Sequence, residues 1–368
     1  MLNTALTGDP HNFGRRVQLL SDGTIHKPRT IAWEWLFLSS QSPLRKLLCD
    51  AFEGRALPCP FDLFADVSFS PTGASLAHGR VERVFWEPDR LELSVEVSQK
   101  IGSVIGLLSW FGIGDLHEQN LAFGRMRASG RPICMPLDIE CIFDDYQLPS
   151  QTLLVAAKGQ ELAGCGLRSL YPLIENSSTP LQAIAAIGMG YVGSLDLLNQ
   201  LEAPIGELIG SLAQADQWPI RVILRDTSSY PLEKDFNAND WSPPLLPSEI
   251  EQLRRKDIPY FFRSIESREL AYFTSPEQAT LIPVDELSTS GFPRLANIRE
   301  LKRSNRRFAW ANRQTLLEAG LLQLTRGMLP ANIKPSTATI NDLSIEVTQE
   351  QIICDLGNSK NRRFQCKR

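Results

Sequence analysis

Histidine is scarce in this chain, and no charge of one sign dominates. Only 4 of the 368 residues are histidines, and the 38 Lys and Arg residues do not outnumber the 42 Asp and Glu residues. The formal net charge is −4. A chain without a basic excess has no general electrostatic attraction for nucleic acid or for an acidic membrane surface. We therefore expect no nucleic-acid partner.

Long apolar runs are also missing. The stretch over residues 101–113 is interrupted by Gly, Ser and Trp, and it falls short of the ~20 residues that a membrane span needs. Residues 1–10 contain neither the basic start nor the apolar stretch of a secretory signal. These features predict a cytoplasmic protein without a membrane span.

Several motifs that identify common enzyme classes are absent. The seven cysteines form no CxxC pair, which argues against a zinc ribbon or a disulfide framework and favours inert, buried thiols. No GxGxxG, GxxxxGK[ST] or GxSxG string occurs. Their absence excludes an ordinary kinase glycine loop, a P-loop and an α/β-hydrolase nucleophile elbow. The composition, 43% hydrophobic and 22% charged, is that of an ordinary globular protein.

Two of the four histidines lie in the same local setting. A Gly-Asp-x-His string occurs over residues 8–11 and again over residues 114–117, the second followed by Asn120. Gly and Asp are common in polar turns, so two simple turns are the alternative interpretation. The repetition, and the trailing Asn of the second string, favour a chemical role.

The hydrophobic patterns predict a mixed α+β fold. Residues 16–27 form a β-hairpin with an Asp-Gly turn, and Thr30 caps a helix that follows it. Helical spacing covers residues 91–111, and residues 179–212 are rich in helix. Short strands are expected between residues 61 and 85, over residues 132–136 and over residues 220–224.

The C-terminal third is expected to be largely helical from Pro247, with a polar, peripheral tail after Pro335. Residues 295–324 carry a run of basic side chains, namely Arg299, Lys302, Arg303, Arg306, Arg307 and Arg313. A solvated helix face is the simplest interpretation of such a run, and a docking face for an acidic peptide segment is the alternative.

Four side chains stand in the order that phosphoryl transfer from ATP requires. Lys27 lies on the return strand of the predicted hairpin, Asp115 and Asn120 lie five residues apart on one loop, and Asp138 follows a strand. A phosphate-binding cation, a catalytic Asp and Asp or Asn ligands for Mg²⁺ are the parts that such a reaction uses. Taken alone, Lys27 is equally typical of an exposed strand lysine.

Six short strings, in this order along the chain, resemble the dehydratase domain of class II lanthipeptide synthetases, the LanM family. They are residues 8–15 (GDPHNFGR), 26–29 (HKPR), 114–120 (GDLHEQN), 137–140 (LDIE), 221–230 (RVILRDTSSY) and 257–261 (DIPYF). The resemblance implies a lipid-kinase-like, two-lobed fold with a small β-rich N-lobe and a larger, mainly helical C-lobe. It also implies an enzyme that phosphorylates Ser and Thr of a ribosomally made precursor peptide. The same site then eliminates phosphate to give dehydroalanine and dehydrobutyrine.

The resemblance assigns the phosphorylation step to the residues of the kinase order. Lys27 holds the phosphates of ATP, and Asp115 is the catalytic aspartate. His117 supports the loop of Asp115, and Asn120 and Asp138 bind Mg²⁺. ATP and Mg²⁺ are thus the expected cofactors.

For elimination the resemblance implies Asp9, His11, Arg221 and Thr227. An arginine fork suits the geometry of a leaving phosphate, and Thr227 offers a hydroxyl donor. An ordinary strand-end threonine is the alternative for Thr227. The residues do not decide which group removes the α-proton.

The expected organisation has an N-terminal kinase-like lobe over residues 1–90 and a C-lobe with the catalytic and metal loops over residues 91–240. A helical extension over residues 241–335 and a peripheral tail over residues 336–368 follow. Most of the family's N-terminal region and its zinc-binding cyclase half are absent from this chain, so a separate cyclase or other modifying enzyme is an expected partner. The alternatives are a kinase that stops at the phosphorylated product, acting on a peptide, a protein or a small molecule, and a degenerate kinase-like scaffold that binds a precursor peptide.

Overall fold

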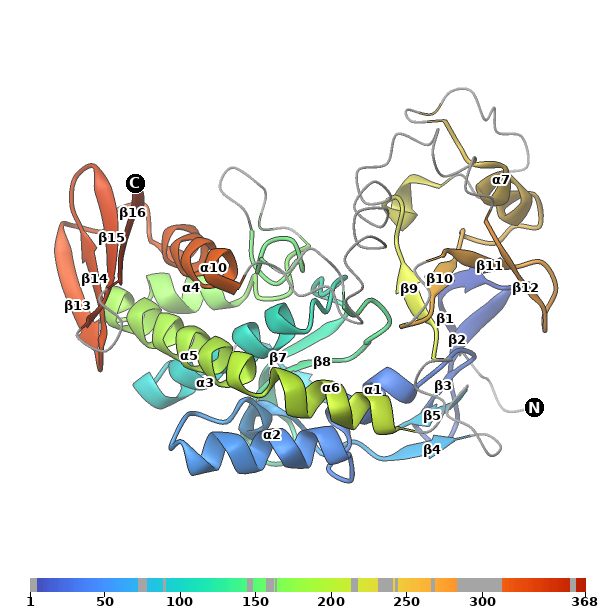
Figure 1. The fold of residues 1–368 in the computed structure, drawn as a ribbon, viewed down its shortest axis with the longest axis horizontal. Helices are drawn as coiled ribbons and strands as arrows, with labels where there is room; N and C mark the ends of the chain where they lie inside the picture. The colour runs from blue at the N-terminus through green and yellow to red at the C-terminus, as the bar shows by residue number, and fades with distance from the viewer. Residues whose placement is uncertain are drawn as a thin grey trace. The chain divides into compact units, whose positions relative to one another are not determined.

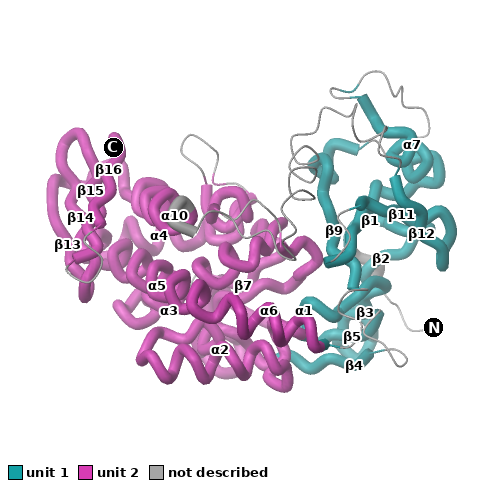
Figure 2. Tube along the Cα trace, viewed as in Figure 1, with its two compact units in different colours: residues 1–35, 67–83, 212–309 teal, residues 36–66, 84–211, 310–368 magenta. Residues whose placement is uncertain are grey.

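The predicted α+β class is confirmed. The computed structural model of the chain, drawn in Figure 1, combines helices with several small antiparallel sheets. It describes residues 5–71, 78–88, 91–143, 148–156, 162, 164–212, 218–230, 241, 244–265, 269–282, 313–357 and 362–368. The chain divides into two compact units, and each is built from separate stretches of sequence (Figure 2). Unit 1 takes residues 1–35, 67–83 and 212–309, and unit 2 takes residues 36–66, 84–211 and 310–368.

Unit 1 contains two antiparallel sheets. The first has the order β1-β2-β3-β5-β4 and is made of β1 (Ala5–His11), β2 (Arg15–Leu19), β3 (Ile25–Lys27), β4 (Phe69–Pro71) and β5 (Gly79–Val81). The second has the order β12-β11-β10-β9 and is made of β9 (Ile220–Val222), β10 (Phe261–Arg263), β11 (Ala271–Phe273) and β12 (Ala279–Leu281). Helix α7 (Pro247–Arg254) and the short 3₁₀ helix η3 (Thr227–Ser229) complete the described part of this unit.

The predicted hairpin and the helix after it are confirmed, and local signals explain both. Gly23 adopts a φ of 83° in the turn between β2 and β3, where the Asp22 side chain accepts a hydrogen bond from the Thr24 backbone N–H at 2.9 Å. Helix α1 (Ala32–Leu38) follows, and Thr30 Oγ1 accepts a hydrogen bond from the Ala32 N–H at 3.2 Å. The return strand of the hairpin thus ends at Lys27, shortly before the capped helix begins at Ala32.

Unit 2 is mainly helical, with two small sheets. Its helices are α2 (Pro43–Gly54), α3 (Val95–Trp110), α4 (Leu170–Glu175), α5 (Pro180–Gln200), α6 (Glu202–Ser211) and α10 (Arg313–Met328), together with the 3₁₀ helix η1 (Pro60–Leu63). One sheet has the order β6-β7-β8, from β6 (Trp86–Glu87), β7 (Leu121–Met126) and β8 (Pro132–Pro136). The predicted helices over residues 91–111 and 179–212, and the strand over residues 132–136, are therefore confirmed.

Glycines let α3 and α5 approach each other at backbone distance. A Cβ placed on Gly102 would lie 1.9 Å from the Ile187 carbonyl oxygen, and one on Gly190 would lie 1.9 Å from the Gln99 carbonyl oxygen. Among the described helices, α5 alone is long and apolar enough to cross a membrane, but 83% of its most apolar window is buried inside the protein. This burial is typical of the central helix of a folded core.

The C-terminal third differs from the expectation. Strands β10, β11 and β12 lie where helix was expected, and residues 336–367 form a second sheet of unit 2 from β13 (Ser336–Ile340), β14 (Leu343–Val347), β15 (Gln351–Leu356) and β16 (Arg362–Lys367). This sheet packs against α5 and α10, with Leu343, Ile345 and Cys354 fully buried. Polar side chains alternate with these apolar ones, which lowers the average hydropathy of the segment without removing its buried face. Residues 299–307 of the basic run lie outside the described residues, and Arg313 begins α10.

Replacing Gly102 by Ala tests the α3–α5 contact. The new methyl group meets backbone that cannot rotate away, so we expect Gly102→Ala to lower the free energy of unfolding by about 3 kcal/mol or more. Gly54→Ala is the matched control, because a Cβ there has no atom within 4 Å. Urea denaturation measures both, and equal stabilities of the two variants would contradict the close approach.

Candidate functional site

Lys27 belongs to a buried ion pair in unit 1. Its Nζ lies 2.7 Å from Glu34 Oε1, and Arg29 Nη2 lies 2.9 Å from the same oxygen. The Glu34 side chain is completely buried and that of Lys27 is 6% exposed. A buried carboxylate needs such partners, since an unpaired charge costs several kcal/mol. The interpretation of Lys27 as an exposed strand lysine is therefore wrong.

Glu34 was not among the predicted site residues. It lies in the first turn of α1, seven residues after Lys27. The sequence contains a lysine at the end of a strand and a glutamate in the next helix. Only the fold shows that the two side chains form an ion pair. Glu34 fixes the position of the Lys27 ammonium group.

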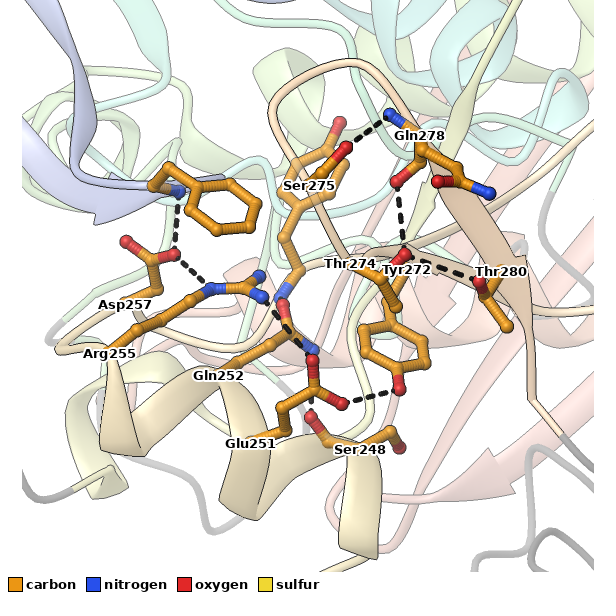
Figure 3. A network of polar contacts seen from close by, with 12 residues as sticks. Ser248, Glu251, Gln252, Arg255, Asp257, Tyr272, Thr274, Ser275, Gln278 and Thr280 are labelled. Carbon is orange, nitrogen blue, oxygen red and sulfur yellow. Dashed lines mark hydrogen bonds and ion pairs between the residues drawn. The ribbon is translucent and has the colours of Figure 1, made fainter.

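The turn between β1 and β2 is held by Asp257, which comes from a distant part of unit 1. The two carboxylate oxygens of Asp257 accept hydrogen bonds from the backbone N–H groups of Phe13 and Gly14, each at 2.7 Å. Phe13 and Gly14 have φ values of 70° and 75°, so consecutive N–H groups point at one anion. Arg255 Nε donates to Asp257 at 2.7 Å, as Figure 3 shows. Asp257 is fully buried, so these donors compensate its charge.

His11 is oriented by a main-chain carbonyl group. Its Nδ1 lies 2.8 Å from the oxygen of Ile258. A carbonyl oxygen can only accept, so Nδ1 carries the proton and the neutral ring has its lone pair on Nε2. Asp9 was expected to orient His11, but its side chain is exposed and makes no hydrogen bond that the described part of the chain records. Ile258 takes that role instead.

His11 and Arg221 meet the same aromatic ring. The centroid of the Tyr260 ring lies 5.5 Å from that of His11 and 5.3 Å from Arg221 Cζ. Arg221 is on β9, opposite Phe262 of β10. Gln252 of α7 accepts a hydrogen bond from the Tyr260 N–H at 2.9 Å, which fixes the backbone beneath the ring. His11 and Arg221, two of the residues predicted for elimination, therefore contact the same side chain of unit 1.

Thr227 lies in η3, beyond the end of β9. The N-terminal cap of η3 is Asp226, whose side chain accepts a hydrogen bond from Ser228 N–H at 2.9 Å. Thr227 is half-buried. The ring contacts of Tyr260 described above involve His11 and Arg221, and Thr227 is not one of their members.

The segment that follows Arg221 is anchored by a third buried carboxylate. Glu249 Oε1 lies 2.8 Å from Arg225 Nε and accepts a hydrogen bond from Tyr230 Oη at 2.6 Å. Burial, and then the neighbouring Glu249 charge, raise the pKa of Tyr230, so this phenol stays protonated. Its role is to hold the chain over residues 225–230.

The loop of the second Gly-Asp-x-His string lies in unit 2, directly after α3. Asp115 adopts a φ of 59°, and Asn120 Nδ2 donates a hydrogen bond to its carbonyl oxygen at 2.9 Å. His117 Nδ1 accepts from the Gln119 N–H at 3.2 Å, which leaves the proton of the neutral ring on Nε2. That nitrogen lies 3.9 Å from Asp115 Oδ1. The predicted support of Asp115 by His117 is consistent with this geometry.

The loop leads straight into a buried hairpin that returns to Asp138. Strands β7 and β8 pair in register from Leu121 opposite Pro136, and the Leu137 N–H donates to the Asn120 carbonyl oxygen at 2.8 Å. Asn120 and Leu137 are therefore cross-strand neighbours, and Asp138 is the next residue. Asp115, Asn120 and Asp138 are all half-buried.

Asn120 and Asp138 carry oxygen atoms of the kind that Mg²⁺ takes as ligands, an amide oxygen and a carboxylate. The Asn120 side chain donates a hydrogen bond through Nδ2 to the Asp115 carbonyl oxygen. Within the described residues, no group of three His, Cys, Asp or Glu side chains could hold a metal by itself. Mg²⁺ commonly takes one or two protein ligands and completes its shell with phosphate and water.

Cys165 lies beside this loop. It forms an isolated β-bridge with His117, and burial raises the pKa of its thiol. A thiol with a raised pKa is a poor nucleophile.

No family model matches the chain, and no curated protein matches it either. The case for a function thus depends on the motifs and on the geometry of the two units.

Asp257→Asn tests the anchor of the β1–β2 turn. An amide has one acceptor oxygen in place of two, so one of the three donors around it loses its partner. We expect the free energy of unfolding to fall by about 3 kcal/mol, as for other broken buried charge pairs. Urea denaturation is the measurement, and Asp22→Asn is the control, because Asp22 also accepts turn hydrogen bonds but is exposed. If both variants lose equally little, Asp257 is not the anchor.

Proposed function

We propose that this chain phosphorylates Ser and Thr of a precursor peptide with ATP and then eliminates the phosphate. The observation that supports the proposal most is the loop–hairpin unit of residues 115–138. It contains an Asp, an Asn five residues later, and an Asp after the return strand. This is the side-chain order of a phosphoryl-transfer site. Its backbone is held by a hydrogen bond from Asn120 Nδ2 to the Asp115 carbonyl oxygen and by one from the Leu137 N–H to the Asn120 carbonyl oxygen. The finer fold that we propose is the kinase-like, two-lobed one.

In the phosphorylation step, Asp115 accepts the proton of the Ser or Thr hydroxyl group as that oxygen attacks the γ-phosphorus of ATP. Asn120 and Asp138 are the residues that would hold Mg²⁺, and the ion would supply positive charge beside the phosphates. His117 orients the Asp115 carboxylate. Each of these residues is placed by a backbone hydrogen bond or by the buried hairpin, which is the preorganisation that such a reaction needs.

Lys27 supplies the cation for the phosphates of ATP in this proposal. The pairing with Glu34 supports that role, because a lysine paired with a helix glutamate is a recurring feature of kinases. Glu34 holds the ammonium group at 2.7 Å and so fixes its position.

The elimination step is supported by the contacts of His11 and Arg221 with the Tyr260 ring. A base removes the α-proton of the phosphorylated residue, the electrons of that C–H bond form the Cα=Cβ double bond, and the C–O bond to phosphate breaks. Arg221 carries the charge of the departing phosphate by its fork of donors. His11 has its lone pair on Nε2, so it is the proton acceptor that we propose, with Thr227 as a hydroxyl donor.

Asp138→Asn tests the phosphorylation step. A neutral amide binds a hard cation less well than a carboxylate does, so the rate of ATP-dependent modification should fall about 100-fold or more. The assay is mass spectrometry of the Ser- and Thr-containing peptide encoded beside the gene of this chain, incubated with ATP and Mg²⁺. Asp66→Asn, which changes an exposed carboxylate of the same unit, should keep the original rate. An unchanged rate for Asp138→Asn at saturating Mg²⁺ would contradict the assignment.

Arg221→Ala separates the two steps. The variant should still transfer phosphate but should accumulate phosphopeptide, because the leaving phosphate loses its charge-assisted hydrogen bonds, a loss of roughly 100-fold in rate. Unaltered protein should lose one water per modified residue, and Arg80→Ala, an exposed strand arginine of unit 1, should behave in the same way. Phosphopeptide from the unaltered protein would instead identify a kinase without elimination. No ATP consumption at all would identify a scaffold.

A further inference from the structure

Cys49 and Cys59 form a pair of thiols in unit 2, away from the residues discussed above. Cys49 lies on α2, next to the buried Leu48, and Cys59 is the residue that precedes η1. The two sulfur atoms are 3.9 Å apart, and the Cys59 S–H donates to Cys49 Sγ. Both residues are half-buried, whereas Cys134, Cys141, Cys165 and Cys354 are buried.

The two thiols differ in charge state. The hydrogen bond from Cys59, and then the Arg45 guanidinium group, lower the pKa of Cys49 to about 7 against the opposing effect of burial. The same hydrogen bond and burial raise the pKa of Cys59. One member is thus ready to react as a thiolate, and the other keeps its proton.

We infer that Cys49 and Cys59 form an oxidation site for hydroperoxides, with Cys49 as the attacking sulfur and Cys59 as the resolving one. The Cys49 thiolate attacks one peroxide oxygen, the O–O bond breaks, and a sulfenic acid forms on Cys49 while hydroxide leaves and takes up a proton. Cys59 sulfur then attacks Cys49 sulfur, and the sulfenic oxygen leaves as water with the proton of Cys59. In sum, two thiols and hydrogen peroxide give one disulfide and two waters. Each sulfur loses one electron, and the peroxide gains both.

The disulfide would join two elements that lie in the core of unit 2. A disulfide needs its sulfur atoms about 2.05 Å apart, so the thiols must approach by a little under 2 Å from their present separation. Helix α2 carries Cys49, and η1, which begins after Cys59, packs against α3 and β8. Strand β8 leads to Asp138, so the new bond would restrain the elements that support the candidate metal loop.

The first test is peptide mapping of the full chain after treatment with hydrogen peroxide. We expect one linked peptide pair that contains Cys49 and Cys59, lighter by two hydrogen atoms than the reduced pair and restored by dithiothreitol. Cys366→Ser is the matched control, because Cys366 is the other half-buried thiol and its loss should leave the disulfide unchanged. Equal oxidation of all seven cysteines, or a disulfide between two copies of the chain, would overturn the inference.

Two single variants assign the roles of the two sulfurs. Cys59→Ala should stop at the sulfenic acid, which dimedone labels on Cys49, and Cys49→Ala should take up no dimedone at Cys59. In Cys59→Ala the pH midpoint for alkylation of Cys49 by iodoacetamide should rise from about 7 toward 9.0, because the hydrogen bond from Cys59 is lost. A midpoint that does not move, or a tightly bound zinc ion that protects both thiols from peroxide, would overturn the inference.

Discussion

Three fully buried carboxylates organise unit 1, and each must be neutralised where it lies. Glu34, Glu249 and Asp257 have no solvent-exposed surface. Each is held by an arginine, and Glu34 is also held by Lys27. Removing one partner would leave a buried charge, which costs several kcal/mol, so the geometry around each carboxylate is tightly specified.

Each buried carboxylate positions a part of the proposed chemistry. Glu34 places the Lys27 ammonium group, and Asp257 shapes the turn that follows His11. Glu249 anchors the segment after Arg221. In unit 2, two hydrogen bonds of Asn120 hold the backbone of the loop. Its side chain donates to the Asp115 carbonyl oxygen, and its carbonyl oxygen accepts from the Leu137 N–H, one residue before Asp138.

Local elements of the fold were predictable, and contacts between distant segments were not. Short local sequence patterns predict the Asp-Gly turn, the capped α1 and the apolar α5. By contrast, β10, β11 and β12 are three-residue strands whose existence depends on pairing with one another and with β9, so periodicity carries little signal for them. The polar residues of β14 favour a peripheral tail in the sequence, although they alternate with apolar residues that are buried in the sheet.

The candidate site residues divide in the same way, into those predicted from local sequence and those whose contacts arise only in the fold. Lys27, Asp115, Asn120 and Asp138 are predictions from residue type and spacing along the chain. Glu34, Asp257 and Tyr260 were missed because their roles arise from contacts across the fold, and an acidic residue does not reveal its burial in the sequence. The Asp9–His11 pairing was expected from proximity in sequence, but the bulge between Thr7 and His11 and the carbonyl of Ile258 set a different partner.

The proposal that Glu34 holds Lys27 for the phosphates of ATP can be tested by the affinity for Mg·ATP. Isothermal titration calorimetry of the full chain and of Glu34→Gln needs no peptide substrate, and Glu82→Gln, an exposed glutamate of unit 1, controls for the loss of one negative charge. We expect Glu34→Gln to bind Mg·ATP about tenfold more weakly, or about 1.4 kcal/mol, while Glu82→Gln is unchanged and all three proteins unfold cooperatively. Removing a negative charge should by itself strengthen the binding of an anion, so unchanged or tighter binding by Glu34→Gln would rule out this role of Glu34.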